Sequence, residues 1–182
     1  NAEIVARIMG LKISCLSATL IVSFLYDNKI YTYTYGDGAV ILETLDGTIY
    51  IRQTEYENNA PYYLVYKIDK IQDINYYNQR KDMLTIFHNS KEPDKKTISN
   101  SLYNVTCMDV NKVQQYKSLS ICSDGLFSFV REHDMIQTKQ MPLDLATNFL
   151  SFKTIKGEFL KRRLSNEFKT MTSENIVNID DF

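Results

Sequence analysis

Two Asp-Gly steps constrain the fold of this chain more than any other feature. They are Asp37-Gly38 and Asp46-Gly47, and each separates runs in which apolar or aromatic residues alternate with polar ones. Alternation with a period of two is typical of β-strands, and Asp-Gly is among the strongest short-range signals for a hairpin turn. The pattern therefore predicts an antiparallel meander over residues 17–54.

The rest of the chain adds strands first and helices later. Further strands are predicted in residues 62–69, 82–88, 103–110 and 117–123, with a charged turn in residues 91–96. Residues 3–16 have the spacing of a helix end, and residues 143–152 and 157–171 have the spacing of two helices, the first starting at Pro142. Residues 176–182 are again β-like. This order is typical of an α+β domain built on antiparallel sheet.

Composition excludes several classes of protein. The 182 residues carry 21 Lys and Arg against 22 Asp and Glu, a formal net charge of −1, so the chain is not a strongly basic nucleic-acid binder. Its apolar runs are far shorter than a membrane span and no signal peptide opens it, which predicts a cytoplasmic protein with no membrane partner. Cys15, Cys107 and Cys122 are odd in number and widely spaced, a pattern that favours buried, reduced thiols over disulfides or zinc.

Three aspartates are the candidates for chemistry. Neither histidine has a partner at metal spacing or a nucleophile beside it, and no P-loop or dinucleotide-binding motif occurs. Asp124 ends an apolar strand, and Asp37 lies between two glycines. Asp180 opens the pair Asp180-Asp181 after a second β-like run. Each position also has a plain structural interpretation, as a turn residue for Asp37 and Asp124 and as a solvated tail for the pair.

Carboxylates at the ends of separate strands suit one kind of cofactor. A carboxylate at the end of a buried strand is costly to desolvate unless it is paired or holds a cation. Carboxylates without histidine suit hard, oxygen-preferring Mg²⁺ or Mn²⁺. Two such ions about 3.5–4 Å apart activate water against phosphate esters. The pattern is therefore consistent with metal-dependent phosphoester hydrolysis.

Four short motifs occur in a fixed order along the chain. They are SATLIV (residues 17–22), IYTYTYGDGAV (30–40), SICSDGLF (120–127) and NIDDF (178–182). In this order they resemble four motifs of the PP2C-type metal-dependent protein phosphatases in their bacterial form: the [GA]-A-T-[AL] strand start, the V-A-N-V-G-D-S-R-A-V hairpin in its G-D-G variant, L-x-A-S-D-G-[LIVM]-[WF], and the closing D-[ND]-x-[ST]. The resemblance covers roughly residues 15–182.

The resemblance implies a PP2C-like four-layer αββα sandwich, in which two antiparallel sheets pack face to face between helices. It implies a serine/threonine protein phosphatase that hydrolyses phosphoserine and phosphothreonine with a water bridging two Mn²⁺ or Mg²⁺ ions. By the resemblance, Asp124 and Asp180 would be metal ligands and catalytic residues. Asp37 would match the aspartate around a third, more loosely held ion. The implied partners are a phosphorylated protein substrate and a cognate Ser/Thr kinase.

Two parts of the family pattern have no counterpart in this sequence. The D-G-x-G-G segment, a further acidic ligand and the arginine that meets the substrate phosphate belong before the first motif, and a last strand belongs after the fourth. We therefore expect one PP2C-like domain over residues 1–182, incomplete at both ends. The alternative is a catalytically inactive, pseudophosphatase domain that binds a phosphoprotein or a regulatory ligand.

Tyrosines and a basic run leave two further interpretations. Eleven of the 13 tyrosines lie between Tyr26 and Tyr77, and an aromatic sheet face can stack nucleic-acid bases. Basic residues are sparse in that stretch, however, and tyrosine is a common strand residue, so we expect no nucleic-acid partner. The basic residues 161–163 are interpreted as a solvated helix face rather than a docking patch.

Overall fold

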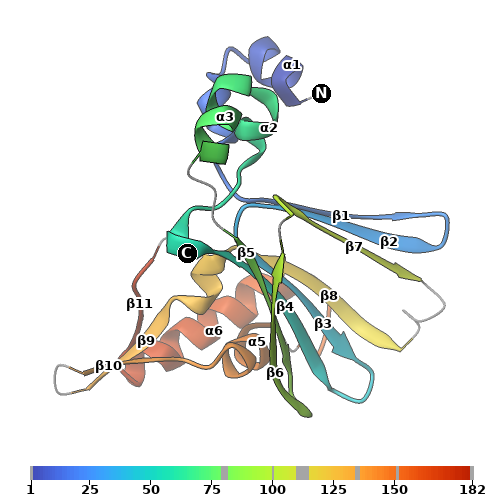
Figure 1. Cartoon of the computed structure of the whole chain (residues 1–182). Coiled ribbons are helices and arrows are strands. Elements are labelled where there is room, and N and C mark those ends of the chain that lie inside the picture. The colour runs from blue at the N-terminus through green and yellow to red at the C-terminus, as the bar shows by residue number, and fades with distance from the viewer. Residues whose placement is uncertain are drawn as a thin grey trace. The chain divides into compact units, whose positions relative to one another are not determined.

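The computed structural model of the chain describes residues 2–78, 82–99, 101–109, 115–133, 136–150 and 152–180 (Figure 1). These residues form an α+β structure with antiparallel sheets, as the sequence predicts. The chain divides into two compact units. The first contains Asn1–Gly38, Gln53–Ile86 and Lys96–Gln114, and the second contains Ala39–Arg52, Phe87–Lys95 and Gln115–Phe182. The expectation of one domain over residues 1–182 stays a prediction.

The first unit combines a three-stranded sheet with short helices. Its elements are α1 (Ala2–Ile8), η1 (Ile13–Leu16), β1 (Leu20–Tyr26), β2 (Lys29–Tyr35), η2 (Glu57–Asn59), α2 (Leu64–Ile68), α3 (Lys70–Asn78) and β7 (Asn104–Asp109). The sheet has the order β1-β2-β7. Asp27 and Asn28 join β1 to β2 with φ angles of 47° and 53°, the left-handed pair that a tight two-residue hairpin requires.

The predicted meander over residues 17–54 is wrong at one connection. β2 pairs with β1 and β7, whereas β3 (Gly38–Thr44) belongs to another sheet, so Asp37-Gly38 is not a hairpin turn. The backbone turns at Gly36, whose φ is +84° and whose N–H donates to the carbonyl oxygen of Tyr62 at 2.8 Å. A Cβ at Gly36 would lie 2.8 Å from Thr19 Oγ1, so only glycine fits this close approach.

The second unit holds the larger core. Its elements, besides β3, are β8 (Tyr116–Cys122), η3 (Asp124–Phe127), β9 (Phe129–His133), β10 (Ile136–Lys139), α5 (Pro142–Leu150), α6 (Phe159–Ser173) and β11 (Ile176–Asn178). Four strands contribute residues to both units: β3, through Gly38 alone, β4 (Ile49–Tyr56), β5 (Met83–Asn89) and β6 (Glu92–Ser99). The two sheets have the orders β6-β5-β4-β3-β8 and β10-β9-β11.

Helices α5 and α6 lie against one face of β3 and β4 (Figure 1). Ile41 and Ile51 from these strands pack with Leu145 and Phe149 of α5 and Met171 of α6, all of them buried. Burying each large apolar side chain contributes about 1.5–3 kcal/mol. This core fixes the ends of β8 and β11, where two of the candidate aspartates lie.

Several local predictions are wrong, and the tyrosines explain the most important one. Residues 62–69 were predicted as a strand, but α2 begins at Leu64 and α3 follows it. Tyr62 and Tyr66, four residues apart, both pack on Tyr76, with ring centroids 5.1 and 4.9 Å from it. Packing of this aromatic cluster overrides the β-propensity of the individual residues.

The predicted turn at residues 91–96 largely belongs to β6, and β9 and β10 were not predicted.

Two of the three cysteines also differ from expectation. Cys15 and Cys107 are exposed rather than buried, and Cys122 is partly buried. No helix among the described residues is long and apolar enough to cross a membrane.

Candidate functional site

Asp124 opens the 3-10 turn η3 directly after β8. The next residues, Leu126 and Phe127, are buried in the core of the second unit, each with 2% of its surface exposed. Packing of Leu126 and Phe127 in the core therefore holds the η3 turn in place, and Asp124 at the start of the turn is partly buried.

Asp180 lies on a segment that hydrogen bonds attach to this same turn. The Asn178 side-chain amide donates to the carbonyl oxygen of Gly125 at 2.8 Å, and the Ile179 N–H donates to the carbonyl oxygen of Ser128 at 3.0 Å. The Ser128 hydroxyl donates to Asp180 Oδ2 at 3.4 Å. We call this set of three bonds the C-terminal latch. It brings the predicted ligands Asp124 and Asp180, distant in the sequence, onto two adjoining segments.

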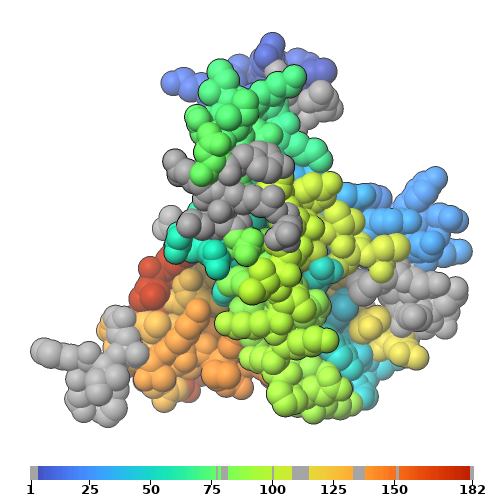
Figure 2. All heavy atoms as spheres, viewed as in Figure 1, coloured from blue at the N-terminus to red at the C-terminus, as the bar shows by residue number. Residues whose placement is uncertain are grey.

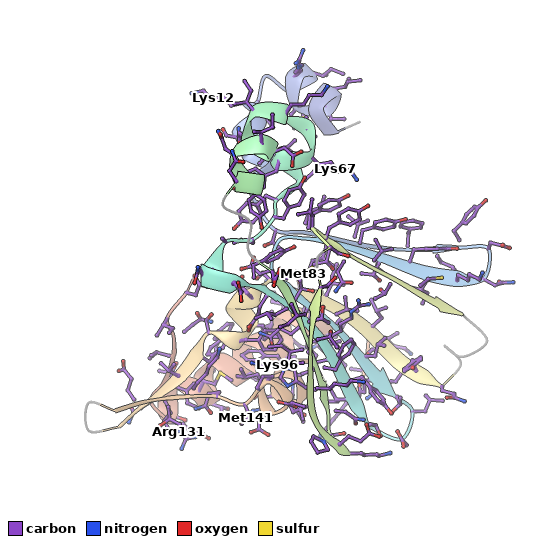
Figure 3. The ribbon with its side chains drawn as sticks, viewed as in Figure 1. Lys12, Lys67, Met83, Lys96, Arg131 and Met141 are labelled. Carbon is purple, nitrogen blue, oxygen red and sulfur yellow. The ribbon has the colours of Figure 1, made fainter. Side chains whose placement is uncertain are left out.

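The surroundings hold the latch in place. β11 pairs with β9 in the register Asn178↔Phe129, and Arg131 of β9 makes an ion pair with Glu174 at 2.7 Å; Arg131 is labelled in Figure 3. Asp180 itself is exposed, and its backbone N–H donates to Asn178 Oδ1 at 2.8 Å. The segment is thus ordered by backbone and side-chain bonds while its carboxylate meets solvent.

Asp37 lies in the first unit. Only 8% of its surface is exposed, and its Oδ1 accepts a hydrogen bond from Thr19 Oγ1 at 2.9 Å. Burial raises the pKa of the Tyr56 phenol far above its ordinary value, and the negative charges of Tyr76 and Asp37 add to this effect. Asp37 is therefore a buried carboxylate with a defined partner. It is not the hairpin-turn residue of the plain structural interpretation, because β2 and β3 belong to different sheets.

The carboxylates of Asp124 and Asp180 could supply some of the oxygen ligands of a metal ion. Among the described residues, no group of three or more His, Cys, Asp or Glu side chains could hold a metal. Asp181, the second member of the closing pair, lies outside the described residues. Asp124 and Asp180 nevertheless fit Mg²⁺ chemically, because Mg²⁺ in proteins is commonly bound through one or two carboxylates plus waters and substrate phosphates. The described residues would supply part of such a coordination sphere.

Three residues that hydrogen-bond beside these carboxylates are not predicted as site residues by any sequence motif. Thr19, Ser128 and Asn178 each hydrogen-bond near a candidate aspartate, yet none was proposed as a site residue. The Asn-x-Asp spacing of Asn178 and Asp180 is a local signal for the turn seen here, in which an asparagine side chain accepts from the backbone two residues on. The contacts of Thr19 and Ser128 carry no such local signal.

Comparison of the chain with protein-family models, with curated proteins and with solved structures found no match in any of the three. The assignment of a function therefore depends on the residues themselves and on the four motifs.

Proposed function

We propose that this chain is a PP2C-like, metal-dependent serine/threonine phosphatase domain in which Asp124 and Asp180 bind Mn²⁺ or Mg²⁺. The C-terminal latch is the observation that carries the proposal. It brings together the turn and the segment that hold these two aspartates, the residue type that a hard cation prefers. The substrate would be a phosphorylated serine or threonine in a protein, and a cognate kinase would be a functional partner.

Each residue of the site has a distinct part in this proposal. A bound metal would supply activated water and neutralise phosphate charge. Leu126 and Phe127 hold the turn that carries Asp124, and the Ser128 hydroxyl orients the Asp180 carboxylate through its hydrogen bond. Because the latch fixes these groups before any ligand arrives, little ordering is needed on metal binding.

The finer fold prediction and Asp37 belong to the same proposal. Packing of α5 and α6 on one face of β3 and β4 supports one helical layer of a four-layer αββα sandwich. Asp37 is proposed as a ligand of a third, more loosely held ion on the strength of the resemblance, and its bond from Thr19 would hold the carboxylate in one orientation.

A second candidate function is a catalytically inactive domain that binds a phosphoprotein or regulatory ligand. One observation favours it: in the described part of the chain no three side chains gather at a metal-binding spacing. This candidate keeps the latch and the β-core but predicts no turnover.

The test is hydrolysis of p-nitrophenyl phosphate and of a phosphothreonine peptide, with and without Mn²⁺. We expect Mn²⁺-dependent turnover that falls in Asp124→Asn and in Asp180→Asn by at least the roughly 10- to 100-fold that loss of a partner of a metal ligand costs. Glu92→Gln, which neutralises an exposed carboxylate on β6, should behave as the unchanged chain.

The outcomes separate the two candidates. Absence of turnover with a folded chain, whether or not calorimetry detects Mn²⁺ binding, would favour the inactive domain. Turnover that needs no metal and survives Asp124→Asn would contradict both.

A further inference from the structure

A groove of about 620 Å³ in the second unit shares Leu126 with the support of the proposed phosphatase site but has no further part in that site. Residues 117–122 of β8 form one wall. The other wall consists of apolar side chains of α5, α6 and the residues between them, among them Phe149, Leu150, Phe152, Phe159, Leu160 and Leu164. The described residues that line the groove include neither Asp124 nor Asp180.

The first wall is the edge of a sheet. Among the strands that the described residues form, β8 has β3 as its only neighbour. Alternate backbone N–H and C=O groups of an edge strand point away from the sheet and can pair with another extended chain. The groove thus combines backbone donors and acceptors on its β8 wall with apolar side chains on its other wall.

The opposite edge of the same sheet is protected and β8 is not. β6 carries Pro93, Lys95 and Lys96, which discourage pairing with another strand. This part of the chain is among the residues drawn in yellow-green in Figure 2. β8 has a single lysine, Lys117, and its ammonium group is already bound to the buried Glu43 carboxylate at 2.8 Å. The two edges therefore differ in the features that prevent strand addition.

The small side chains of β8 explain why the groove is hollow. The register pairs Ala39 with Cys122 and Ile41 with Ser120, so Ser120 and Cys122 share the face of the sheet that packs on α5 and α6. Side chains this small leave space beside the helices, and Leu160 of α6 stays 44% exposed. Apolar side chains entering from an added strand would fill this space.

The rim of the groove is basic. Residues 152–164, which include the start of α6, contain five lysines and arginines and one acidic residue, Glu158. Lys153, Lys156 and Lys161 are exposed and each adjoins in sequence a residue that lines the groove, namely Phe152, Ile155 and Leu160. Lys161 also lies 3.8 Å from Glu158, so Lys153 and Lys156 contribute most of this positive charge. A partner with acidic residues at its ends would be electrostatically complementary to this rim.

We propose that this groove binds an extended segment of another polypeptide as an additional strand on β8. Apolar residues at alternate positions of the segment fill the space between β8 and α6, and acidic residues at its ends face the basic rim. An extended polypeptide is the occupant because a small apolar molecule or a lipid chain would leave the backbone groups of the edge unpaired. Strand addition of this kind obtains affinity from main-chain bonds and specificity from alternate side chains.

The test uses a fluorescein-labelled peptide of sequence Asp-Glu-Val-Thr-Ile-Thr-Val-Glu-Asp, with binding measured by fluorescence anisotropy. Ile155→Asp and Leu160→Asp place a carboxylate in the groove and should each weaken binding about tenfold or more, the equivalent of about 1.4 kcal/mol. Ile155 is 73% exposed, so its replacement leaves the fold intact even where Leu160→Asp does not. Ile98→Asp, at an exposed position on β6, is the matched control and should bind the peptide normally.

Two further peptides test the binding mode. N-methylation of alternate peptide nitrogens on one edge should abolish binding, because it removes the donors that pair with β8. Replacing the terminal acidic residues with lysine should weaken it. Equal binding of the N-methylated peptide, or equal binding by Ile155→Asp, would overturn the proposal. Sedimentation that shows a dimer dispersed by Ile155→Asp, without peptide binding, would also overturn it and identify a second copy of the chain as the occupant.

Discussion

Cys122 shows how burial controls the chemistry of a single residue. Its thiol donates to the carbonyl oxygen of Ala39 at a sulfur–oxygen distance of 3.8 Å, and burial raises its pKa to about 12. The thiolate is the reactive form, so Cys122 stays a poor nucleophile near neutral pH. Its exclusion from the catalytic candidates is consistent with this environment.

We expect iodoacetamide at pH 8 to alkylate the exposed Cys15 and Cys107 at least about tenfold faster than Cys122. Peptide mass spectrometry over time measures the three rates. Because the pKa of Cys122 is raised, its labelling in the folded chain should increase as the pH rises toward that value. Equal rates at all three cysteines would contradict the burial of Cys122.

Ser128 connects the η3 turn to Asp180 through a single hydrogen bond from its hydroxyl group. If Asp180 binds the metal, Ser128→Ala should lower Mn²⁺ affinity or metal-dependent turnover about 10- to 100-fold, as loss of a partner of a metal ligand usually does. Titration of activity with Mn²⁺ measures the shift. Ser165→Ala, at an exposed position on α6, is the control, and unchanged Mn²⁺ dependence in Ser128→Ala would refute the orienting role.

At the scale of elements, the turn between β3 and β4 depends on one carboxylate. Asp46 accepts hydrogen bonds from the Thr44 hydroxyl, from Lys91 Nζ at 2.9 Å and from the Thr48 N–H at 3.2 Å. These bonds, that of Thr44 above all, hold the pKa of Asp46 well below its ordinary value of 3.8. A carboxylate whose pKa is lower in the folded state stabilises that state above its unfolded pKa, and this stability is lost as the pH falls.

We therefore expect Asp46→Asn to lower the melting temperature at pH 7. The difference from the unchanged chain should shrink as the pH is lowered below about 4. Thermal unfolding followed by circular dichroism at pH 7, 5 and 3 measures it. A difference that stays constant with pH would show that the charge of Asp46 does not contribute.

At the scale of the whole molecule, each unit has its own apolar centre. Phe149 anchors the core of the second unit, with ring centroids 5.3 Å from Phe129 and 5.5 Å from Phe168. In the first unit, Tyr35 stacks on Tyr103 at 4.8 Å, and Lys67, labelled in Figure 3, lies 4.6 Å from the Tyr103 ring centre. Many of the tyrosines that had suggested base stacking thus pack on each other.

Phe149→Ala should destabilise the chain by about 3–5 kcal/mol, the usual cost of truncating a fully buried phenylalanine. Phe24→Ala removes the same side chain from a position on β1 that is 45% exposed, so its effect should be much smaller. Urea unfolding monitored by circular dichroism measures both free energies of unfolding. Similar losses in the two variants would contradict the burial of Phe149.

Features that depend on neighbouring residues can be recognised from the sequence. Asp27 and Asn28 specify the β1–β2 hairpin, Pro142 marks the first residue of α5, and the position of Asp124 beyond β8 follows from one apolar run ending at a glycine. Turn chemistry and periodicity act over a few residues, so they can be recognised without knowledge of the rest of the chain.

Contacts between residues far apart in the sequence became known only from the folded chain. Residues 64–68 form a helix instead of part of a strand because Tyr62 and Tyr66 pack on Tyr76. Asp37 is not a hairpin residue because β2 pairs with β7 rather than with β3. The C-terminal latch depends in the same way on hydrogen bonds between separate parts of the chain. The position of β8 at a sheet edge likewise depends on which strands pair. Burial and strand pairing are set by contacts between residues far apart in sequence, and local patterns carry no information about those partners.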